Sequence, residues 1–336
     1  MAKRLLSFGL ALLLVTTLLN PPANAAKVKI AISYEVGGKG DNGINDLASV
    51  GLERAIKKYN LSKLDIREQI TDGTLGDRIT RVRFLARSKY QLIICVGSGY
   101  ADTVKRIANE FPNTQFAIID DETVGLTNVS NLSFATSEAV YLAAAALASA
   151  SKSGKIGFIG DKSLSSASNY ALAFSKGALA ANSKIKVSSF LGEDSVSDEV
   201  TKQINTGVDQ IFSTWSKSDE AISTIASFSK SSKKTLISGV LPEQYFLNFS
   251  AGKKNQYLVL NKRFDLAVEQ IIATEIAGKN MLDILDASKG IYGHRYTLKD
   301  GGLSVKLVNG GTFSAKTRSI LEDLKAGRVK NLPKSQ

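Results

Sequence analysis

The densest group of side chains that could bind a ligand lies between Ser33 and Asp46, directly after the first apolar run of the chain. This segment reads SYEVGGKGDNGIND and combines four glycines with acidic and amide side chains. Glycine lets the backbone turn tightly and approach a ligand, while carboxylates and amides supply directional acceptors and donors. The segment therefore predicts a contact loop for a small polar ligand, with these candidate contacts: Glu35, Asp41, Asn42 and Asn45.

Two other interpretations of this loop stay open. The stretch from Gly38 to Gly43 matches the dinucleotide fingerprint G-x-G-x-x-G, which would indicate a cofactor-dependent enzyme. Asp41 opposes that interpretation, because its charge would stand where the pyrophosphate sits, and no acidic residue follows about 20 positions later at a clear strand end. In the other, structural interpretation, Asp41 or Asn42 only caps the following helix.

Further candidates follow later predicted strands. Ligands of an open parallel sheet bind beyond the carboxyl ends of its strands, so the first residues after each strand are favoured. The residues chosen in this way are Ser98, Gly99, Tyr100, Asp120, Trp215, Gly239 and Lys262. The polar ones would bind ligand oxygens, and the ring of Tyr100 or Trp215 would stack on a flat ligand. Each has a structural alternative: a tight turn, a solvated loop formed by the acidic triplet Asp120-Asp121-Glu122, a core aromatic ring or a solvated lysine.

The residues needed for catalysis or for a metal site are scarce. His294 is the only histidine and Cys95 the only cysteine, which excludes metal sites built from several histidines or paired cysteines. Cys95 lies in the apolar run QLIICV and is expected to be a buried small hydrophobe. No G-x-S-x-G nucleophile motif and no phosphate-binding P-loop occur. The sequence thus predicts no catalytic residue, no metal and no cofactor.

Short β-branched runs alternate with amphipathic helical stretches from Lys27 onward, which is typical of parallel strands joined by crossover helices. Strands are predicted at 28–34, 64–70, 92–96, 116–119, 129–134, 155–159, 186–190, 210–213, 235–238 and 257–260, with a Gly-rich strand region at 290–308. Helices are predicted at 44–59, 77–88, 101–111, 137–151, 166–181, 198–205, 219–229, 265–277 and 315–326. The predicted fold class is α/β.

At 336 residues the chain exceeds what one hydrophobic core usually organises, so two domains are expected. The last segment is too short for a third domain and is predicted to complete both lobes. The N-terminal lobe would be 26–134 plus 262–293, and the C-terminal lobe 135–261 plus 294–330. Crossings near residues 134, 262 and 294 would form a three-segment hinge.

The first 25 residues have the layout of a secretory signal peptide. Lys3 and Arg4 precede an apolar run from Leu5 to Leu19, and the tripeptide ANA ends at Ala25. An uncleaved anchor helix is the alternative, although the run is shorter than the roughly 20 residues that span a bilayer. The prediction is an exported, extracytoplasmic protein of the periplasm or cell surface, without a lipobox cysteine.

The formal net charge of +12 would fall by two units, to +10, if Lys3 and Arg4 left with the signal peptide. A basic protein is attracted to anionic surfaces. Its Lys and Arg residues are spread along the chain without a basic-aromatic cluster, so anionic envelope polymers or lipids are expected near it and nucleic acid is not.

The loop from Tyr34 to Asp46 resembles the signature loop of the basic membrane protein family. These are type I periplasmic binding proteins that include purine-nucleoside receptors of ABC importers. The likeness continues through IICVG at 93–97, FP at 111–112, FAIID at 116–120, NV at 128–129, YLA at 141–143, GKIGFIG at 154–160 and KAGR at 325–328. The resemblance implies two Rossmann-like lobes, a nucleoside held between them, and delivery to a membrane permease with a cytoplasmic ATPase.

The chain departs from the family pattern at three positions. The family usually carries Asp where Glu35 stands, and a Phe that stacks on the nucleobase where Ile44 stands. The acid that holds the ribose in the family is replaced by Leu241, whereas Lys262 agrees with a family position near the ligand. Ile44 therefore joins the candidate contacts as the residue at the stacking position.

The predicted function is that of a monomeric solute-binding protein of an ABC importer, which binds a nucleoside or a related small polar ligand and performs no chemistry. One alternative is a ligand sensor or structural envelope protein that keeps the fold without nucleoside binding. A dinucleotide-dependent enzyme is the third.

Overall fold

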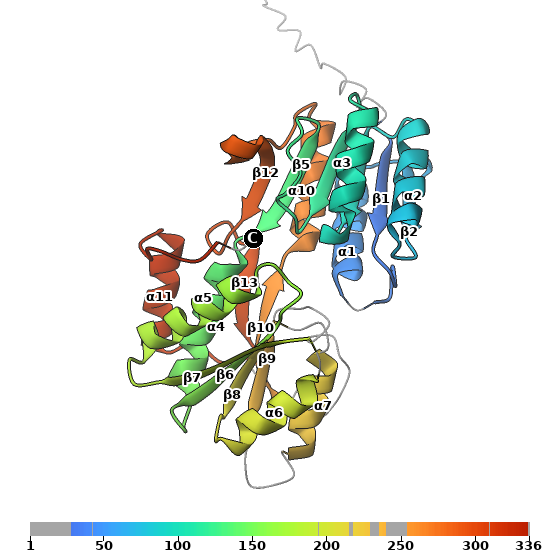
Figure 1. Ribbon diagram of the computed structural model, residues 1–336. Coiled ribbons are helices and arrows are strands. Elements are labelled where there is room, and N and C mark those ends of the chain that lie inside the picture. The colour runs from blue at the N-terminus through green and yellow to red at the C-terminus, as the bar shows by residue number, and fades with distance from the viewer. Residues whose placement is uncertain are drawn as a thin grey trace, which may run out of the picture.

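The computed structural model describes residues 28–41, 43–193, 195–214, 218–228, 235–239, 254–308 and 310–334, which form two lobes (Figure 1). The strands of the first lobe are β1 (Ile30–Tyr34), β2 (Ile66–Ile70), β3 (Leu92–Val96), β4 (Gln115–Ile119), β5 (Val129–Phe134), β11 (Asp283–Asp286) and β12 (Ile291–Tyr296). Its helices are α1 (Ile44–Tyr59), α2 (Leu75–Arg87), α3 (Ala101–Glu110) and α10 (Phe264–Ile276), with short 3-10 turns η1 (Lys63–Asp65), η2 (Ser98–Tyr100) and η3 (Ala287–Lys289).

The second lobe repeats the alternation of strands and helices. Its strands are β6 (Lys155–Asp161), β7 (Lys186–Gly192), β8 (Gln210–Ser213), β9 (Leu236–Gly239), β10 (Gln256–Lys262) and β13 (Leu303–Leu307). Its helices are α4 (Thr136–Ala150), α5 (Ala167–Ala181), α6 (Val196–Asn205), α7 (Ser218–Phe228) and α11 (Ala315–Lys325).

Both sheets are mostly parallel. The seven-stranded sheet has the order β11-β12-β5-β4-β3-β1-β2, and the six-stranded sheet has the order β13-β10-β9-β8-β6-β7. Only the pairs β11–β12 and β10–β13 are antiparallel among the strand pairs of the described residues. This arrangement confirms the predicted α/β class with two parallel sheets.

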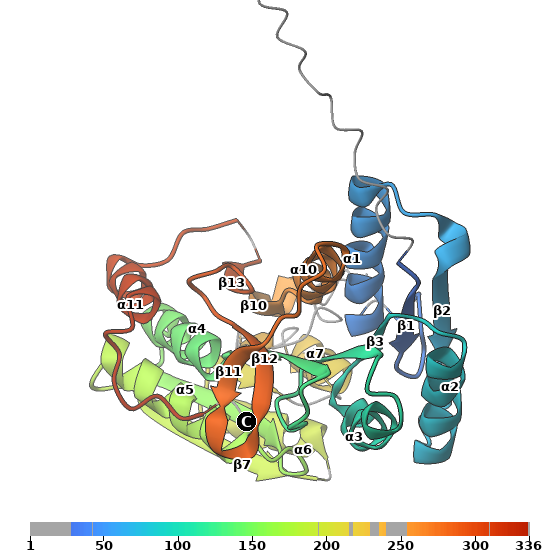
Figure 2. The same ribbon diagram turned by 90° about the horizontal axis from the view of Figure 1, so that it is seen from above.

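The central strands β1, β3 and β4 are buried along their whole length. Figure 2 shows why: α1 and α10 lie on one face of their sheet, and α2 and α3 lie on the other. Successive side chains of a strand point to opposite faces, so Ile30 and Ile32 pack with the α1–α10 layer while Ala31 packs with the α2–α3 layer. A sheet covered on both faces requires continuous apolar runs, as the sequence has here.

The chain passes between the lobes after β5, after β10 and after β12. These crossings lie side by side, because the N–H of Ala135 donates to the carbonyl of Tyr296 at 2.8 Å and that of Arg263 to the carbonyl of Gly302 at 2.9 Å. β12 continues to Tyr296 in the first sheet, so the last crossing follows that residue and lies beyond the crossing expected near residue 294.

One aromatic ring from each crossing packs at the junction. The ring of Phe134 lies 5.3 Å, between centroids, from the ring of Phe264 and 5.3 Å from that of Tyr296. All three side chains are almost fully buried. The hinge therefore belongs to a continuous apolar cluster that extends into both lobes.

The crossings also fix which sheet edges meet. The chain leaves β5 at the carboxyl end of that strand and passes into the second lobe. It leaves β10 at the carboxyl end of that strand and returns to the first lobe. Most other strands of each sheet are parallel to these two. The carboxyl ends of both sheets therefore face the junction between the lobes, where ligands of open α/β sheets bind.

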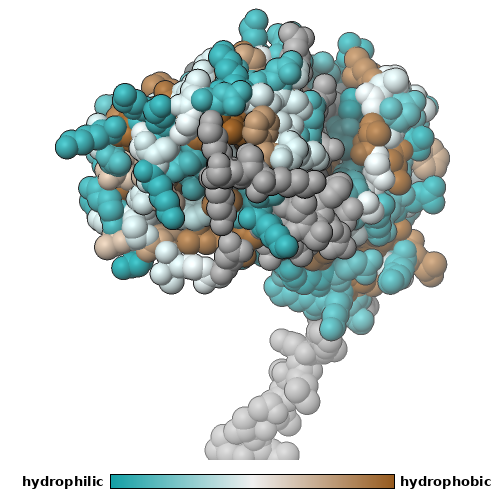
Figure 3. All heavy atoms as spheres, turned by 90° about the horizontal axis from the view of Figure 1, so that it is seen from below, coloured by the Kyte–Doolittle hydropathy of each residue, from teal (hydrophilic) through white to brown (hydrophobic). Residues whose placement is uncertain are grey.

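The predicted signal peptide lies outside the described residues. Within the part of the chain that is described, no helix has the length and apolar character needed to cross a membrane. Figure 3 shows hydrophilic side chains spread over the visible face, with hydrophobic ones scattered between them.

Candidate functional site

Asp41 binds the backbone at the start of α1. Its carboxylate accepts hydrogen bonds from the N–H groups of Gly43 at 2.7 Å, Asn45 at 3.3 Å and Asp46 at 3.3 Å. Such N–H groups have no acceptor within the helix, and negative charge is favourable at this end. Asp41 thus occupies the helix start that a dinucleotide pyrophosphate would need, as the structural interpretation of this loop expected.

Asn45 ties the same loop to the end of β1. Its side-chain oxygen accepts from the N–H of Glu35 at 3.0 Å, and its side-chain nitrogen donates to Asp41 at 2.8 Å. The same nitrogen also lies 3.3 Å from the carbonyl oxygen of Glu35 and 3.4 Å from that of Val36. With only 1% of its surface exposed, Asn45 shapes the loop from inside.

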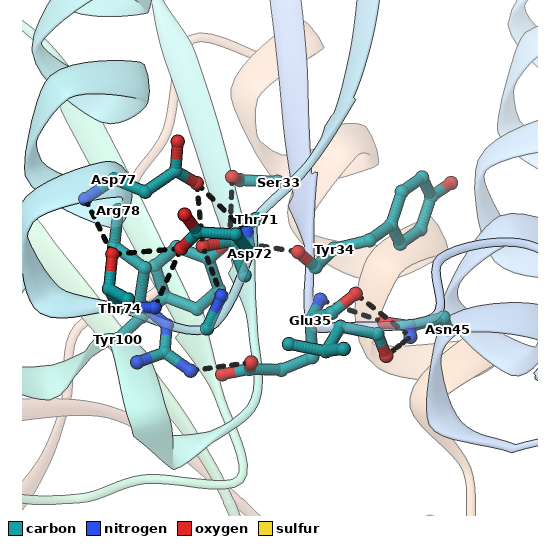
Figure 4. A network of polar contacts seen from close by, with 12 residues as sticks. Ser33, Tyr34, Glu35, Asn45, Thr71, Asp72, Thr74, Asp77, Arg78 and Tyr100 are labelled. Carbon is teal, nitrogen blue, oxygen red and sulfur yellow. Dashed lines mark hydrogen bonds and ion pairs between the residues drawn. The ribbon is translucent and has the colours of Figure 1, made fainter.

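Glu35 pairs with Arg78, a residue that was not among the predicted contacts. Nη2 of Arg78 donates to Oε2 of Glu35 at 2.6 Å, and the two side chains are 14% and 18% exposed. Figure 4 shows this contact beside the ring of Tyr100. The guanidinium carbon of Arg78 lies 5.2 Å from the centre of that ring.

Tyr100 is a buried side chain whose ring packs against Arg78 of this ion pair. Its side chain is fully buried, its hydroxyl lies 2.9 Å from the hydroxyl of Ser33, and it donates to the carbonyl of Tyr34 at 2.8 Å. Burial raises the pKa of the Tyr100 hydroxyl, so it stays a neutral donor. The ring therefore offers no open face on which a ligand could stack.

The turn after β3 is packed closely against Glu35 and Arg78. A Cβ atom at Gly99 would contact Oε1 of Glu35 and would lie 2.9 Å from Nη2 of Arg78. A Cβ atom at Gly97, whose φ is +98°, would lie 3.1 Å from Cγ of Glu35 and 3.7 Å from Cδ1 of Ile44. Ser98 and Gly99 are exposed at this turn. The glycines thus leave room for the ion pair.

Asp120 and Lys262 form an ion pair between the two sheets. Nζ of Lys262 donates to both carboxylate oxygens of Asp120 at 2.8 Å, and the side chains are 10% and 25% exposed respectively. Asp120 adopts a left-handed φ of +68° directly after β4, and its N–H donates to the carbonyl of Leu132 at 2.8 Å. Two predicted contacts, far apart in the sequence, therefore meet at the junction.

The other acids of the triplet also have partners. Oε2 of Glu122 accepts from the hydroxyl of Ser133 at 2.8 Å and from Nε and Nη2 of Arg295 at 2.9 and 2.7 Å. Asp121 is buried and accepts from the N–H and the hydroxyl of Thr123. Burial, with smaller contributions from the neighbouring acids, raises the pKa of Asp121. The three acids thus have partners within the protein and do not form a solvated loop.

The second lobe contributes Gly239 and Thr214 to the same region. Gly239 is the last residue of β9, is buried, and pairs with Ser213 and Val259. Thr214 follows β8, and its buried hydroxyl has no hydrogen-bond partner among the described residues. The predicted contacts Asn42 and Trp215 lie outside the described residues.

Four carboxylates at or near the strand ends each pair with one basic side chain. The pairs are Glu35 with Arg78, Asp120 with Lys262, Glu122 with Arg295, and Asp77 with Arg81. In the described ranges, no group of three or more His, Cys, Asp or Glu side chains is placed to hold a metal ion. The arrangement presents polar donors and acceptors with little net charge.

Sequence reasoning missed Arg78 and Thr214. Thr74 caps α2 by accepting from the N–H of Asp77 at 3.2 Å, and this T-x-x-D signal would have placed Arg78 on the first turn of that helix. Thr214 directly follows a predicted strand and met the criterion used for the other candidates. For Glu122, the triplet was recognised, but its distant partner Arg295 had no local signal.

Known proteins resemble this chain in sequence. ABC transporter nucleoside-binding protein BmpA of Lactococcus lactis is 32% identical over 133 residues, which are 40% of this chain and 38% of that protein. An uncharacterized lipoprotein of Pyrococcus furiosus is 35% identical over 98 residues, 29% of this chain and 24% of that protein. These matches therefore span well under half the length of the relatives. Because relatives carry the name lipoprotein, they give no support to the expected absence of a lipobox cysteine.

Solved structures resemble the whole fold. An ABC transporter solute-binding protein from Conexibacter woesei superposes with a TM-score of 0.71 at 16% identity, covering 92% of this chain and 99% of that one. One from Aeropyrum pernix gives 0.70 at 17% identity, covering 91% and 94%. These likenesses confirm the predicted two-lobed fold. The family model of PnrA-like ABC transporter substrate-binding proteins matches residues 27–276, and the chain belongs to this family, named Bmp.

Proposed function

We propose that this protein binds a nucleoside, or a related small and uncharged polar ligand, between its lobes and presents it to an ABC permease outside the cytoplasm. The observation that carries the proposal is the ion pair of Asp120 and Lys262, which links the carboxyl ends of the two sheets. Family membership supports the transport role. The name of the Lactococcus lactis relative supports the nucleoside.

The polar contacts of the ligand are assigned to Glu35, Ser98, Gly99, Asp120 and Lys262. A carboxylate paired with a cation still offers lone pairs to hydroxyl or N–H groups, and the cation offers further N–H donors. A charged ligand would instead have to leave water without a counter-charge, because the charges described at these strand ends already pair with one another. The pairing therefore favours uncharged ligands.

The flat part of the ligand would meet a different surface from that in the family pattern. Ile44 supplies apolar contact beside Gly97 but has no π face, and the ring of Tyr100 is buried. Trp215 remains our predicted stacking ring. This combination would make ring binding weaker than in relatives with an aromatic residue at the position of Ile44.

Ligand binding would act on the lobes through the junction. Asp120 follows a strand of one sheet and Lys262 ends a strand of the other, so a ligand that contacts both gains most of its contacts when the lobes are close together. A ligand can shift the equilibrium between the open and closed forms only to the extent that it binds one form more tightly than the other. We propose that closure presents one shape to the permease, and that the protein acts as a monomer.

Thermal-shift screening tests this function. The panel holds adenosine, inosine, guanosine, uridine, the free bases, ribose and NAD. Tight binding at a hundredfold excess over Kd stabilises the folded protein by about 2.7 kcal/mol. Asp120→Asn should abolish most of a nucleoside shift, whereas Asp286→Asn, which removes a carboxylate that caps η3 and pairs with Lys289, should preserve it.

The other outcomes of the screen are equally informative. A shift with NAD alone would overturn the proposal in favour of a dinucleotide-dependent protein. No shift with any compound would favour a sensor or structural envelope protein that keeps the fold without nucleoside binding.

A further inference from the structure

We propose that Arg78 is a positioning residue of the ligand site, which fixes the carboxylate of Glu35 so that Oε1 accepts a hydroxyl or N–H group of the ligand. The inference rests on the proposed function, since it assigns a role within the same site. Its basis is the 2.6 Å contact between Nη2 of Arg78 and Oε2 of Glu35.

Arg78 is held in place before any ligand arrives. It stands on the first turn of α2, which Thr74 caps, and its guanidinium lies over the buried ring of Tyr100. Its Nε is buried and has no acceptor among the described residues. The carboxylate of Glu35 is thus the acceptor that orients this guanidinium.

Glu35 is constrained from three sides. Its N–H donates to Asn45 at 3.0 Å, its Oε2 accepts from Arg78, and the turn at Gly97 and Gly99 packs against its side chain. Oε1 has no hydrogen bond in the described part of the chain and lies at the exposed turn of Ser98 and Gly99. One oxygen is therefore bound internally and the other is available to a ligand.

The length of the side chain matters for this contact. Aspartate, which the family resemblance places at position 35, would end one methylene short of the observed carboxylate position. It would lose the contact with Arg78 unless the backbone moved. Glu35 and Arg78 therefore act together in this chain.

A second ion pair on α2 provides a control that distinguishes an effect on ligand binding from an effect on protein stability. Arg81 binds Asp77 one turn away at 2.7 Å, and its side chain is 41% exposed. Paired charges near the surface contribute little to stability, so Arg81 should matter little for folding. Only Arg78 should matter for the ligand.

Calorimetric titration with inosine, and with adenosine and guanosine in parallel, tests the inference. Arg78→Gln should weaken nucleoside binding about tenfold, the size expected when a charged hydrogen-bonding group is misplaced. Arg78→Lys should recover part of the loss, and Arg81→Gln should bind within about twofold of the wild type. In a Glu35→Gln background, Arg78→Gln should add little, because Arg78 acts through Glu35.

Two results would overturn the inference while leaving the proposed function intact: wild-type affinity in Arg78→Gln, or an undiminished tenfold loss when Glu35 is already Gln. If the wild type binds none of the three nucleosides, the proposed function fails first and the inference fails with it. The wild-type titration thus tells the two failures apart.

Discussion

At the scale of single residues, position relative to strand ends was predictable and the role of most side chains was not. The helix cap formed by Asp41 was one of the predicted alternatives. Asn45 and Tyr100 also lie beside the expected edge, yet they tie a loop and support an arginine, and these roles depend on partners that fold next to them from elsewhere in the chain. Residue type and local spacing contain no record of those partners.

Gly99 provides a test at this scale. A Cβ atom there would contact Glu35 and approach Arg78 to 2.9 Å, so Gly99→Ala should displace the ion pair and weaken nucleoside binding about tenfold. Gly76→Ala is the matched control, because a Cβ atom at that helical position meets nothing within 4 Å. It should leave affinity unchanged and stabilise α2 by about 0.5 to 1 kcal/mol. Equal affinities of the two variants in calorimetry would contradict the assigned packing.

At the scale of elements, apolar periodicity predicted most helices and strands. The bounds of α1, β3, β5 and β8 agree with the prediction at both ends. β11 was missed, because this edge strand is exposed at Asp283 and Ile284 and owes its place to backbone pairing with β12. A strand formed by pairing alone leaves no apolar run in the sequence.

The contact between α1 and α10 gives a prediction about pH. Burial pushes the pKa of Asp265 up, but Arg263 and Arg54 outweigh it and hold the pKa below its usual value. A carboxyl whose pKa is lowered in the folded state stabilises the fold above its unfolded pKa, about 3.9, and loses that contribution as pH falls through the folded value. Asp265→Asn should therefore cost about 2 kcal/mol at pH 7 and less towards pH 3.

Thermal unfolding across this pH range checks the prediction for Asp265. Glu322→Gln serves as the control, since its side chain is 65% exposed and pairs only with Lys325 among the described residues. It should change stability by less than about 0.5 kcal/mol at every pH. If Asp265→Asn lowers the free energy of unfolding by the same amount at every pH, the ionised carboxylate of Asp265 does not stabilise the fold as predicted.

At the scale of the whole molecule, family, fold class and the absence of catalysis are confirmed by membership of a family of substrate-binding proteins. Nucleoside specificity, lobe boundaries and site residues stay predictions. The sequence predicted several crossings between the lobes, but it contained no signal for the contacts around them. Asp120 binds Lys262 across the two sheets, and Glu122 binds Ser133 and Arg295 within the first lobe.

Asp120 therefore restrains how far the lobes can move in the absence of ligand, because its partner Lys262 ends a strand of the other sheet. Asp120→Asn keeps the size of the side chain but removes the charge that holds Lys262, so the distribution of distances between the lobes should broaden. Spin labels at Lys105→Cys and Lys202→Cys, both exposed and one on each lobe, would measure it, because the only natural cysteine, Cys95, is buried. Glu110→Gln breaks an ion pair with Arg83 that lies within one lobe, so it should leave the distribution unchanged. If the two variants broaden it equally, Asp120 does not restrain the hinge.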